Sequence, residues 1–248
     1  METSAKGLRV LVTAGGAGIG RAIAQTFRDH GARVHTSDID PKTKPDTLAD
    51  VADIAQVEKL FQEVKKNLGG LDVLVNNAGI AGPTGKVEDI KPEDWDRCIA
   101  IDLSGMFYCA RKAMPMIKAA GGGSIINLSS AAGLHGFPQR SPYCAAKWGV
   151  VGFTKSLSVE AGPDKVRVNC ICPGIVEGER IERVIEAKAK MLGVSREAFL
   201  ERFLETTSMR STVNAQEIAD MALYLASAAG RHITGQALAV DAGTRYLV

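Results

Sequence analysis

The stretch Thr13-Ala14-Gly15-Gly16-Ala17-Gly18-Ile19-Gly20 decides the fold, because it joins an apolar run of strand length to a segment with helical spacing. Glycines allow this tight turn and let the backbone approach a bound pyrophosphate closely. The N-terminus of the following helix adds free N–H groups and a dipole that favours an anion. Taken alone, the loop also fits a plain strand-to-helix connection. The candidate nucleotide contacts within it are Ala14, Gly16, Ala17, Gly18 and Ile19.

The rest of the chain continues this alternation of strands and helices. Further apolar runs of strand length lie at residues 33–37, 73–76, 124–128, 167–172 and 237–240. Helical spacing separates them, as in Ile19, Ile23 and Phe27. Strands that alternate with helices predict a parallel sheet covered on both faces. We therefore expect an α/β fold, a single domain over residues 1–248 with a Rossmann-like, doubly wound parallel sheet and helices on both faces.

One segment interrupts the alternation. From Gly178 to Thr212 the chain is strongly charged and carries two helical patterns with no strand between them. We interpret residues 178–212 as a helical substrate flap, although an ordinary surface excursion fits the pattern equally well.

Asp38 carries the prediction of cofactor choice. It lies at the end of the second apolar run, where a carboxylate can accept hydrogen bonds from the hydroxyls of an adenosine ribose. A 2'-phosphate would be repelled there, and Ile39 follows in place of an arginine. NAD is therefore expected in preference to NADP, while a strand-end turn residue is the alternative interpretation of Asp38.

Composition excludes several classes of protein. The chain has 248 residues, 46% of them hydrophobic, a formal net charge of +2 and no cationic run that could follow a phosphate backbone, so nucleic acid is not an expected partner. No apolar run is long enough to span a membrane, and METSAKGLRV has no signal-peptide core, so we expect a soluble, cytoplasmic protein. The 5 cysteines lie in apolar segments, which favours reduced buried thiols over a metal site.

A tyrosine and a lysine form the candidate catalytic pair. Tyr143 and Lys147 lie one turn apart in a segment with helical spacing, so their side chains share a face. A nearby ammonium stabilises a phenolate and favours proton exchange with an alcohol or carbonyl oxygen. Ser130 follows an apolar run, and its hydroxyl could bond the reacting oxygen. The pair alone also fits a half-buried aromatic beside a solvated charge.

Several motifs in order give the chain a resemblance to a known family. They are the glycine loop at 13–20, Asp50-Val51, Asn76-Asn77-Ala78-Gly79, Ser130, Tyr143-x-x-x-Lys147 and Pro173-Gly174. Together they make the chain similar to the short-chain dehydrogenases/reductases over essentially its whole length. The resemblance implies that Tyr143 is the general acid/base, that Lys147 tunes it and holds the nicotinamide ribose, and that Ser130 orients the substrate oxygen.

The same resemblance implies further cofactor contacts. Asp50 and Val51 would contact adenine, Asn77 and Gly79 would line the cofactor cleft, and the backbone at Val176 would meet the carboxamide. Family members are commonly tetramers, so a homo-oligomer is expected, with one interface formed by the Tyr143 helix and the helix around Met106.

Three residues depart from the family pattern. Ala14 replaces a glycine, which we expect to be mild because alanine permits close packing, although not a positive φ. Gly178 replaces a threonine that bonds the carboxamide in many relatives. Asp102 stands in place of the asparagine that holds a relay water in the family's catalytic tetrad, and so brings that relay into question.

The resemblance implies hydride transfer between NAD(H) and a secondary alcohol or ketone. The segment GIVEGERIERVIEAKAK resembles sugar- and acid-oxidising relatives, which implies a small polar substrate such as a sugar acid, polyol or hydroxy acid. A 3-oxoacyl-carrier-protein reductase is an alternative that Asp38 disfavours, because such enzymes prefer NADPH. A nucleotide-binding regulator with a silent active site is a further alternative. In the loop before Tyr143, the side chains of His135, Gln139 and Arg140 are either substrate contacts or solvated loop residues.

Overall fold

The computed structural model describes residues 3–248, so Met1 and Glu2 of the domain expected over 1–248 lie outside the described residues. Its centre is a 7-stranded sheet in the order β3-β2-β1-β4-β5-β6-β7, with every neighbouring pair parallel. The strands are β1 (Arg9–Thr13), β2 (Arg33–Asp38), β3 (Thr47–Leu48), β4 (Val73–Asn76), β5 (Gly123–Leu128), β6 (Val166–Pro173) and β7 (Ala237–Val240). The predicted doubly wound α/β fold is confirmed.

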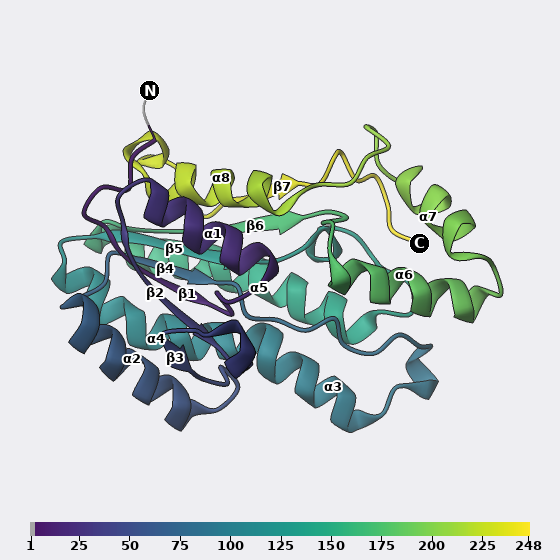
Figure 1. The fold of residues 1–248 in the computed structure, drawn as a ribbon, viewed down its shortest axis with the longest axis horizontal. Helices are drawn as coiled ribbons and strands as arrows, with labels where there is room; N and C mark the ends of the chain where they lie inside the picture. The colour runs from purple at the N-terminus through teal and green to yellow at the C-terminus, as the bar shows by residue number, and fades with distance from the viewer. Residues whose placement is uncertain (1–2) are drawn as a thin grey trace.

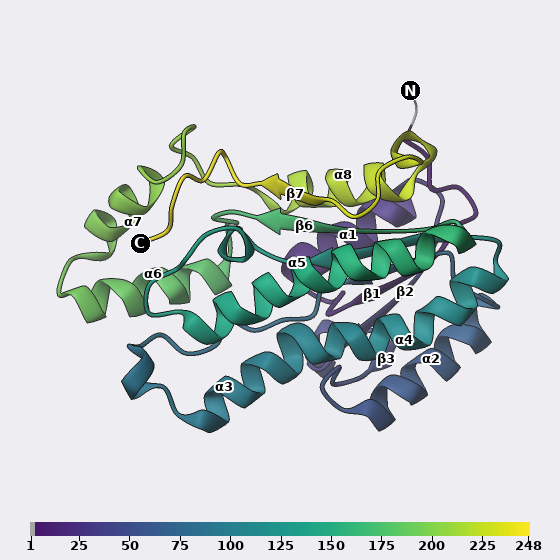
Figure 2. The same cartoon turned by 180° about the vertical axis from the view of Figure 1, so that it is seen from behind.

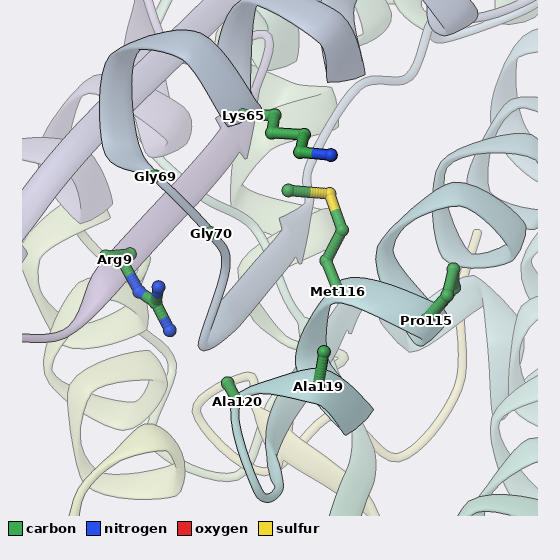
Figure 3. A pocket seen from close by; sticks show the side chains of 8 residues that line it. All are labelled: Arg9, Lys65, Gly69, Gly70, Pro115, Met116, Ala119 and Ala120. Carbon is green, nitrogen blue, oxygen red and sulfur yellow. The ribbon is translucent and has the colours of Figure 1, made fainter.

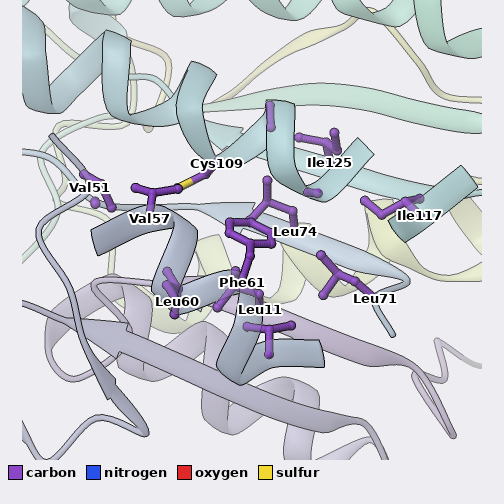
Figure 4. Close-up of a cluster of buried hydrophobic side chains, with 14 of the residues drawn as sticks. Leu11, Val51, Val57, Leu60, Phe61, Leu71, Leu74, Cys109, Ile117 and Ile125 are labelled. Carbon is purple, nitrogen blue, oxygen red and sulfur yellow. The ribbon is translucent and has the colours of Figure 1, made fainter. Parts of the chain in front are cut away.

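Helices cover both faces of the sheet. One face carries α1 (Gly18–Asp29) and α8 (Ala215–Ala226), and the other carries α2 (Ile54–Leu68), α4 (Gly105–Ala119) and α5 (Ser141–Ala161) (Figures 1 and 2). Each face has its own apolar core, and the core beneath α2 and α4 is drawn in Figure 4, where Leu11 and Leu74 from the strands meet Leu60 and Phe61 from α2. These burials supply the main stabilisation of the fold.

Local sequence signals set the helix boundaries. The side chain of Asp53 caps α2 by accepting hydrogen bonds from the N–H groups of Ala55 and Gln56, and the helix ends at Gly69 in the left-handed conformation (φ 77°). Strand β3 escapes such signals because it has only 2 residues, too few to show alternation. It pairs with Ser37 and Asp38 of β2.

The topology places the site at the carboxyl ends of the strands. Successive strands run outward from β1 to β3 on one side and from β4 to β7 on the other, so the order reverses between β1 and β4. In open parallel sheets a ligand crevice forms at such a reversal. Beyond this edge lie α6 (Glu179–Leu192) and α7 (Arg196–Leu204), together with α3 (Pro92–Ile99) (Figure 1).

The expected flap segment contains α6 and α7, two helices with no strand between them. They are attached through a third apolar cluster, in which Phe199 and Phe203 of α7 and Ile185 of α6 pack with Ala131 and Leu247. This cluster is separate from the two cores of the sheet. The flap therefore has an attachment of its own to the body of the domain.

None of the helices in residues 3–248 is both long and apolar enough to span a membrane. Within the same residues, all 5 cysteines are free thiols, and no group of His, Cys, Asp and Glu side chains is arranged to hold a metal ion. Burial raises the pKa of Cys109 to about 12, which keeps this thiol protonated.

Candidate active site

The glycine loop forms one wall of a cleft of about 630 Å³. Helix α1 begins at Gly18 (φ 52°), and its N-cap residue, Ala17, makes no side-chain bond to the first turn. The first N–H groups of α1 are therefore left available for an anionic ligand. At Gly16 an added Cβ would overlap the side chain of Thr43, so only glycine fits this approach of the loop to residues 41–43.

Ala14 corrects an expectation. The residue was expected to avoid a positive φ, yet it adopts φ 48°, in the left-handed region. Asn77 explains how the conformation is held, because its Nδ2 donates hydrogen bonds to the carbonyl oxygens of Thr13 and Ala14, both at 3.0 Å. The turn therefore has the backbone geometry of a glycine turn although it contains an alanine. The side-chain amide of Asn77, which follows β4, stabilises this geometry.

Asp38 lines the same cleft, at the end of β2. Its carboxylate accepts hydrogen bonds from the backbone N–H groups of Gly16 and Asp40, each at 3.1 Å. The next residue, Ile39, is 62% exposed and brings no positive charge. These two hydrogen bonds hold the carboxylate beside the glycine loop.

The cofactor contacts implied by resemblance fall into two groups. Asn77, Gly79 and Val176 line the cleft together with Gly178. Asp50 and Val51 are not among the lining residues: the Asp50 carboxylate pairs with Arg97 of α3 at 2.9 Å, and Val51 is buried beneath Gly105.

Tyr143 and Lys147 lie on α5 and line the same cleft as the glycine loop. Lys147 is 2% exposed, and its Nζ donates to the carbonyl oxygen of Leu128 at 2.9 Å and lies 5.6 Å from the centre of the Tyr143 ring. Ser130 follows β5 in the same cleft, where its Oγ accepts a hydrogen bond from the N–H of Ala132 at 3.1 Å. The three side chains expected to act together therefore line one cavity.

Asp102 reaches this centre from a short π-helix over residues 100–104, between α3 and α4. Its side chain is fully buried, and its Oδ1 accepts a 2.6 Å hydrogen bond from the N–H of Ile80. Its Oδ2 lies 4.0 Å from Lys147 Nζ and has no hydrogen-bond partner within residues 3–248. This distance exceeds a direct hydrogen bond but leaves the two groups within reach of one bridging water.

Arg140 and Arg180, which line the cleft, and Lys188, which is not among its lining residues, were not fully foreseen. Arg140 is only 2% exposed and lines the cavity, so its interpretation as a solvated loop residue is wrong. Arg180, in the first turn of α6, lines it as well, with its guanidinium 5.6 Å from the Tyr143 ring centre. Lys188, also on α6, is fully buried against Phe137. Neither helical spacing nor composition distinguishes buried from solvated cations in such a segment.

Comparison with known proteins gives the family. A sequence profile described as "Enoyl-(Acyl carrier protein) reductase" matches residues 13–245, nearly the whole chain. Curated oxidoreductases match at least 94% of this chain at 32–38% identity. The chain belongs to the short-chain dehydrogenase/reductase family. It is thus an oxidoreductase that acts on alcohols or ketones.

Individual relatives show the range of the family around this chain. The D-beta-hydroxybutyrate dehydrogenase of Rhizobium meliloti is 34% identical, with 94% of this chain and 96% of the relative covered. The 3-oxoacyl-[acyl-carrier-protein] reductase of Chlamydia muridarum is also 34% identical, over 94% of this chain and 95% of its own. The structure of L-sorbose reductase from Gluconobacter frateurii, complexed with NADPH and L-sorbose, matches with a TM-score of 0.89 and 26% identity over 98% of both chains.

A second hollow, of about 320 Å³, lies at the opposite end of the sheet (Figure 3). It is lined by Arg9 at the start of β1, by the end of α2 and by the end of α4. Arg9 is already paired with Asp72 at 2.8 Å. This short-chain dehydrogenase/reductase therefore has its candidate chemistry at the carboxyl edge of the sheet.

Proposed function

We propose that this protein transfers a hydride between NAD(H) and a secondary alcohol or ketone of a small polar substrate, with Tyr143 as the proton-transferring group. The observation that carries the proposal is that Tyr143 and the buried Lys147 line one cleft together with a glycine loop at a helix N-terminus. A nicotinamide cofactor would supply or accept the hydride when bound.

The residues of the cleft fit such a cofactor. The uncapped N-terminus of α1 suits a pyrophosphate, and Asp38 beside it suits a ribose diol. At Val176 the chain pairs with Val213 in parallel, through bonds made by the neighbouring N–H of Glu177 and carbonyl of Ile175. In such a bridge the N–H and C=O of Val176 itself point to the other side of the strand. They would be free to meet a carboxamide in the cleft.

Proton transfer would be carried out by side chains of α5 together with Ser130 and Asp102. Tyr143 would give or take the proton of the substrate oxygen, and Ser130 would orient that oxygen. Lys147 would favour the phenolate electrostatically and hold the nicotinamide ribose. Asp102, with one unpartnered oxygen 4.0 Å from Lys147 Nζ, would hold a water that passes protons toward the lysine.

The preference for NAD rests on Asp38. A 2'-phosphate would be placed beside its carboxylate, with the exposed Ile39 following and no arginine there to compensate. We expect a higher kcat/KM with NAD than with NADP, and we expect the double variant Asp38→Ala, Ile39→Arg to reverse the order, because a guanidinium can pair with the phosphate. Higher efficiency of the unmodified enzyme with NADP would refute the assignment.

A 3-oxoacyl reductase activity remains the second candidate, since a relative with that name covers the chain almost completely. The same cofactor comparison separates the two, because Asp38 disfavours the NADPH used by such reductases. For the assembly we propose a homotetramer in the cytoplasm. Phe107 on α4 and Trp148 on α5 support the oligomer, being 48% and 51% exposed on the helices expected to form an interface.

A further inference from the structure

Arg140 uses only part of its hydrogen-bonding capacity. The residue directly precedes α5, is 2% exposed, and donates through one terminal nitrogen to the carbonyl oxygen of Ala81. Its other two nitrogens, Nε and Nη1, are buried and have no hydrogen-bond partner in residues 3–248. Leaving buried donors of a charged group unpaired is costly. A purely structural role of Arg140 therefore accounts for the hydrogen bonding of only one of its three guanidinium nitrogens.

Arg180 brings a second guanidinium to the same place from the flap. Its terminal nitrogens donate to the carbonyl oxygens of Gly79 and Ile80, at 3.4 and 2.9 Å, so the two arginines bind three consecutive residues of one loop. The guanidinium carbons of Arg140 and Arg180 lie 5.2 and 5.6 Å from the centre of the Tyr143 ring. Two positive charges therefore flank the proposed acid/base.

No carboxylate neutralises this pair. Glu177 and Glu179 line the same cleft, but within residues 3–248 neither forms an ion pair with either arginine, and the Glu177 carboxylate accepts a hydrogen bond from Thr212 instead. Burial first, and less strongly the charge of Arg180, lowers the pKa of Arg140. An anion from outside the chain would remove both the repulsion and the unpaired donors.

We propose that Arg140 and Arg180 together receive a carboxylate of the substrate, so that the enzyme acts on small hydroxy or oxo acids. The planar fork of a guanidinium matches a carboxylate with two parallel hydrogen bonds. Arg180 is exposed and lies in the first turn of α6, and it lines the cleft together with Arg140, so a carboxylate bound there can contact both guanidiniums. The assignment of substrate class rests on the proposed function, whereas the anion site stands on the arginines alone.

Binding of unreactive acids tests the site without turnover. Two acids, benzoate and butyrate, are titrated by calorimetry into enzyme saturated with NADH, each beside its uncharged amide, benzamide or butyramide. Phenyl phosphate serves as a second kind of anion. Each acid should bind at least about 10-fold more tightly than its amide. Arg140→Met and Arg180→Met should each weaken acid binding about 10- to 100-fold and leave the amides nearly unchanged. Arg231→Met removes an exposed arginine outside the cleft and should change neither.

Several results would overturn the proposal: equal binding of acids and amides, a preference for the acid that survives in both cleft variants, or phenyl phosphate bound more tightly than benzoate. If Arg140→Met fails to fold, acid binding is measured in Arg140→Lys and Arg180→Met instead. Arg140→Lys keeps the positive charge but loses the planar fork of the guanidinium. The proposed function is tested separately by turnover of uncharged secondary alcohols. Turnover without acid preference overturns only the carboxylate site, and acid preference without turnover on any alcohol or hydroxy acid overturns only the proposed function.

Discussion

Lys188→Met should change how the stability of the protein depends on pH. Lys188 is fully buried on α6, and its Nζ donates to the carbonyl oxygen of Pro138 at 2.8 Å and to Gln139 Oε1 at 2.9 Å. Burial, reinforced by the charges of Arg140 and Arg202, lowers the pKa of Lys188 from 10.5 to about 8. In the unfolded chain the ammonium is solvated and keeps its ordinary pKa.

The sign follows from counting protons in the two states. Below pH 8 the lysine is charged in both, and the folded state carries the full cost of the buried charge. Between about pH 8 and 10.5 the unfolded chain still holds a proton that the folded protein has released, so the free energy of unfolding rises with pH. At about 1.4 kcal/mol per pH unit, the difference amounts to about 3 kcal/mol. Methionine has no proton to release, so Lys188→Met loses this rise.

Urea unfolding, followed by tryptophan fluorescence at one protein concentration, measures the effect across pH 7 to 10.5. The free energy of unfolding of the unmodified protein should gain up to about 3 kcal/mol relative to Lys188→Met over this window. Lys190→Met, which changes an exposed lysine on the same helix, should follow the unmodified protein. Parallel curves for the unmodified protein and Lys188→Met would show that Lys188 does not release its proton in the folded protein within this pH range.

Two further predictions concern the relay and the flap. Asp102→Asn should retain most activity, with a pH–rate profile displaced by less than about one unit. The asparagine Oδ1 can still accept the hydrogen bond from the N–H of Ile80, and loss of the negative charge acts in opposite directions on Lys147 and Tyr143. A severe loss of rate in the pH–rate series would show that the charge itself is needed. Without ligand, the amide hydrogens of residues 178–212 should exchange faster than those of the sheet, because this segment attaches through a separate apolar cluster. With NADH bound, they should exchange more slowly than in the free protein. Protection equal to that of the strands in both states would exclude a gating role.

The sequence alone could predict the layers of the fold because its longer strands and helices repeat their apolar residues at the right period. Apolar periodicity could not locate β3, which has 2 residues and is held by its pairing to β2. The positive φ of Ala14 could not be predicted either, because the side chain that stabilises it is Asn77, which is far along the chain. Local propensity does not report such long-range hydrogen bonds.

Within the site, motif spacing was sufficient to bring Ser130, Tyr143 and Lys147 to one cleft. The surroundings of these residues were harder to foresee. Asp102 reaches Lys147 from a π-helix that no periodicity indicates, and Arg140 is buried in a segment that looks like a polar loop. Burial of a charged side chain depends on what packs over it, which here includes the flap helix α6.

The comparison of turnover and cofactor binding in Tyr143→Phe tests most directly whether Tyr143 transfers the proton. Alcohols and hydroxy acids are screened with NAD by the absorbance of NADH, and NADH binding is followed by fluorescence titration. We expect a loss of turnover of at least about 100-fold with NADH binding largely intact, because only the transferable proton is removed and the ring remains. Substantial residual turnover in Tyr143→Phe would contradict this expectation, since another group would then supply the proton.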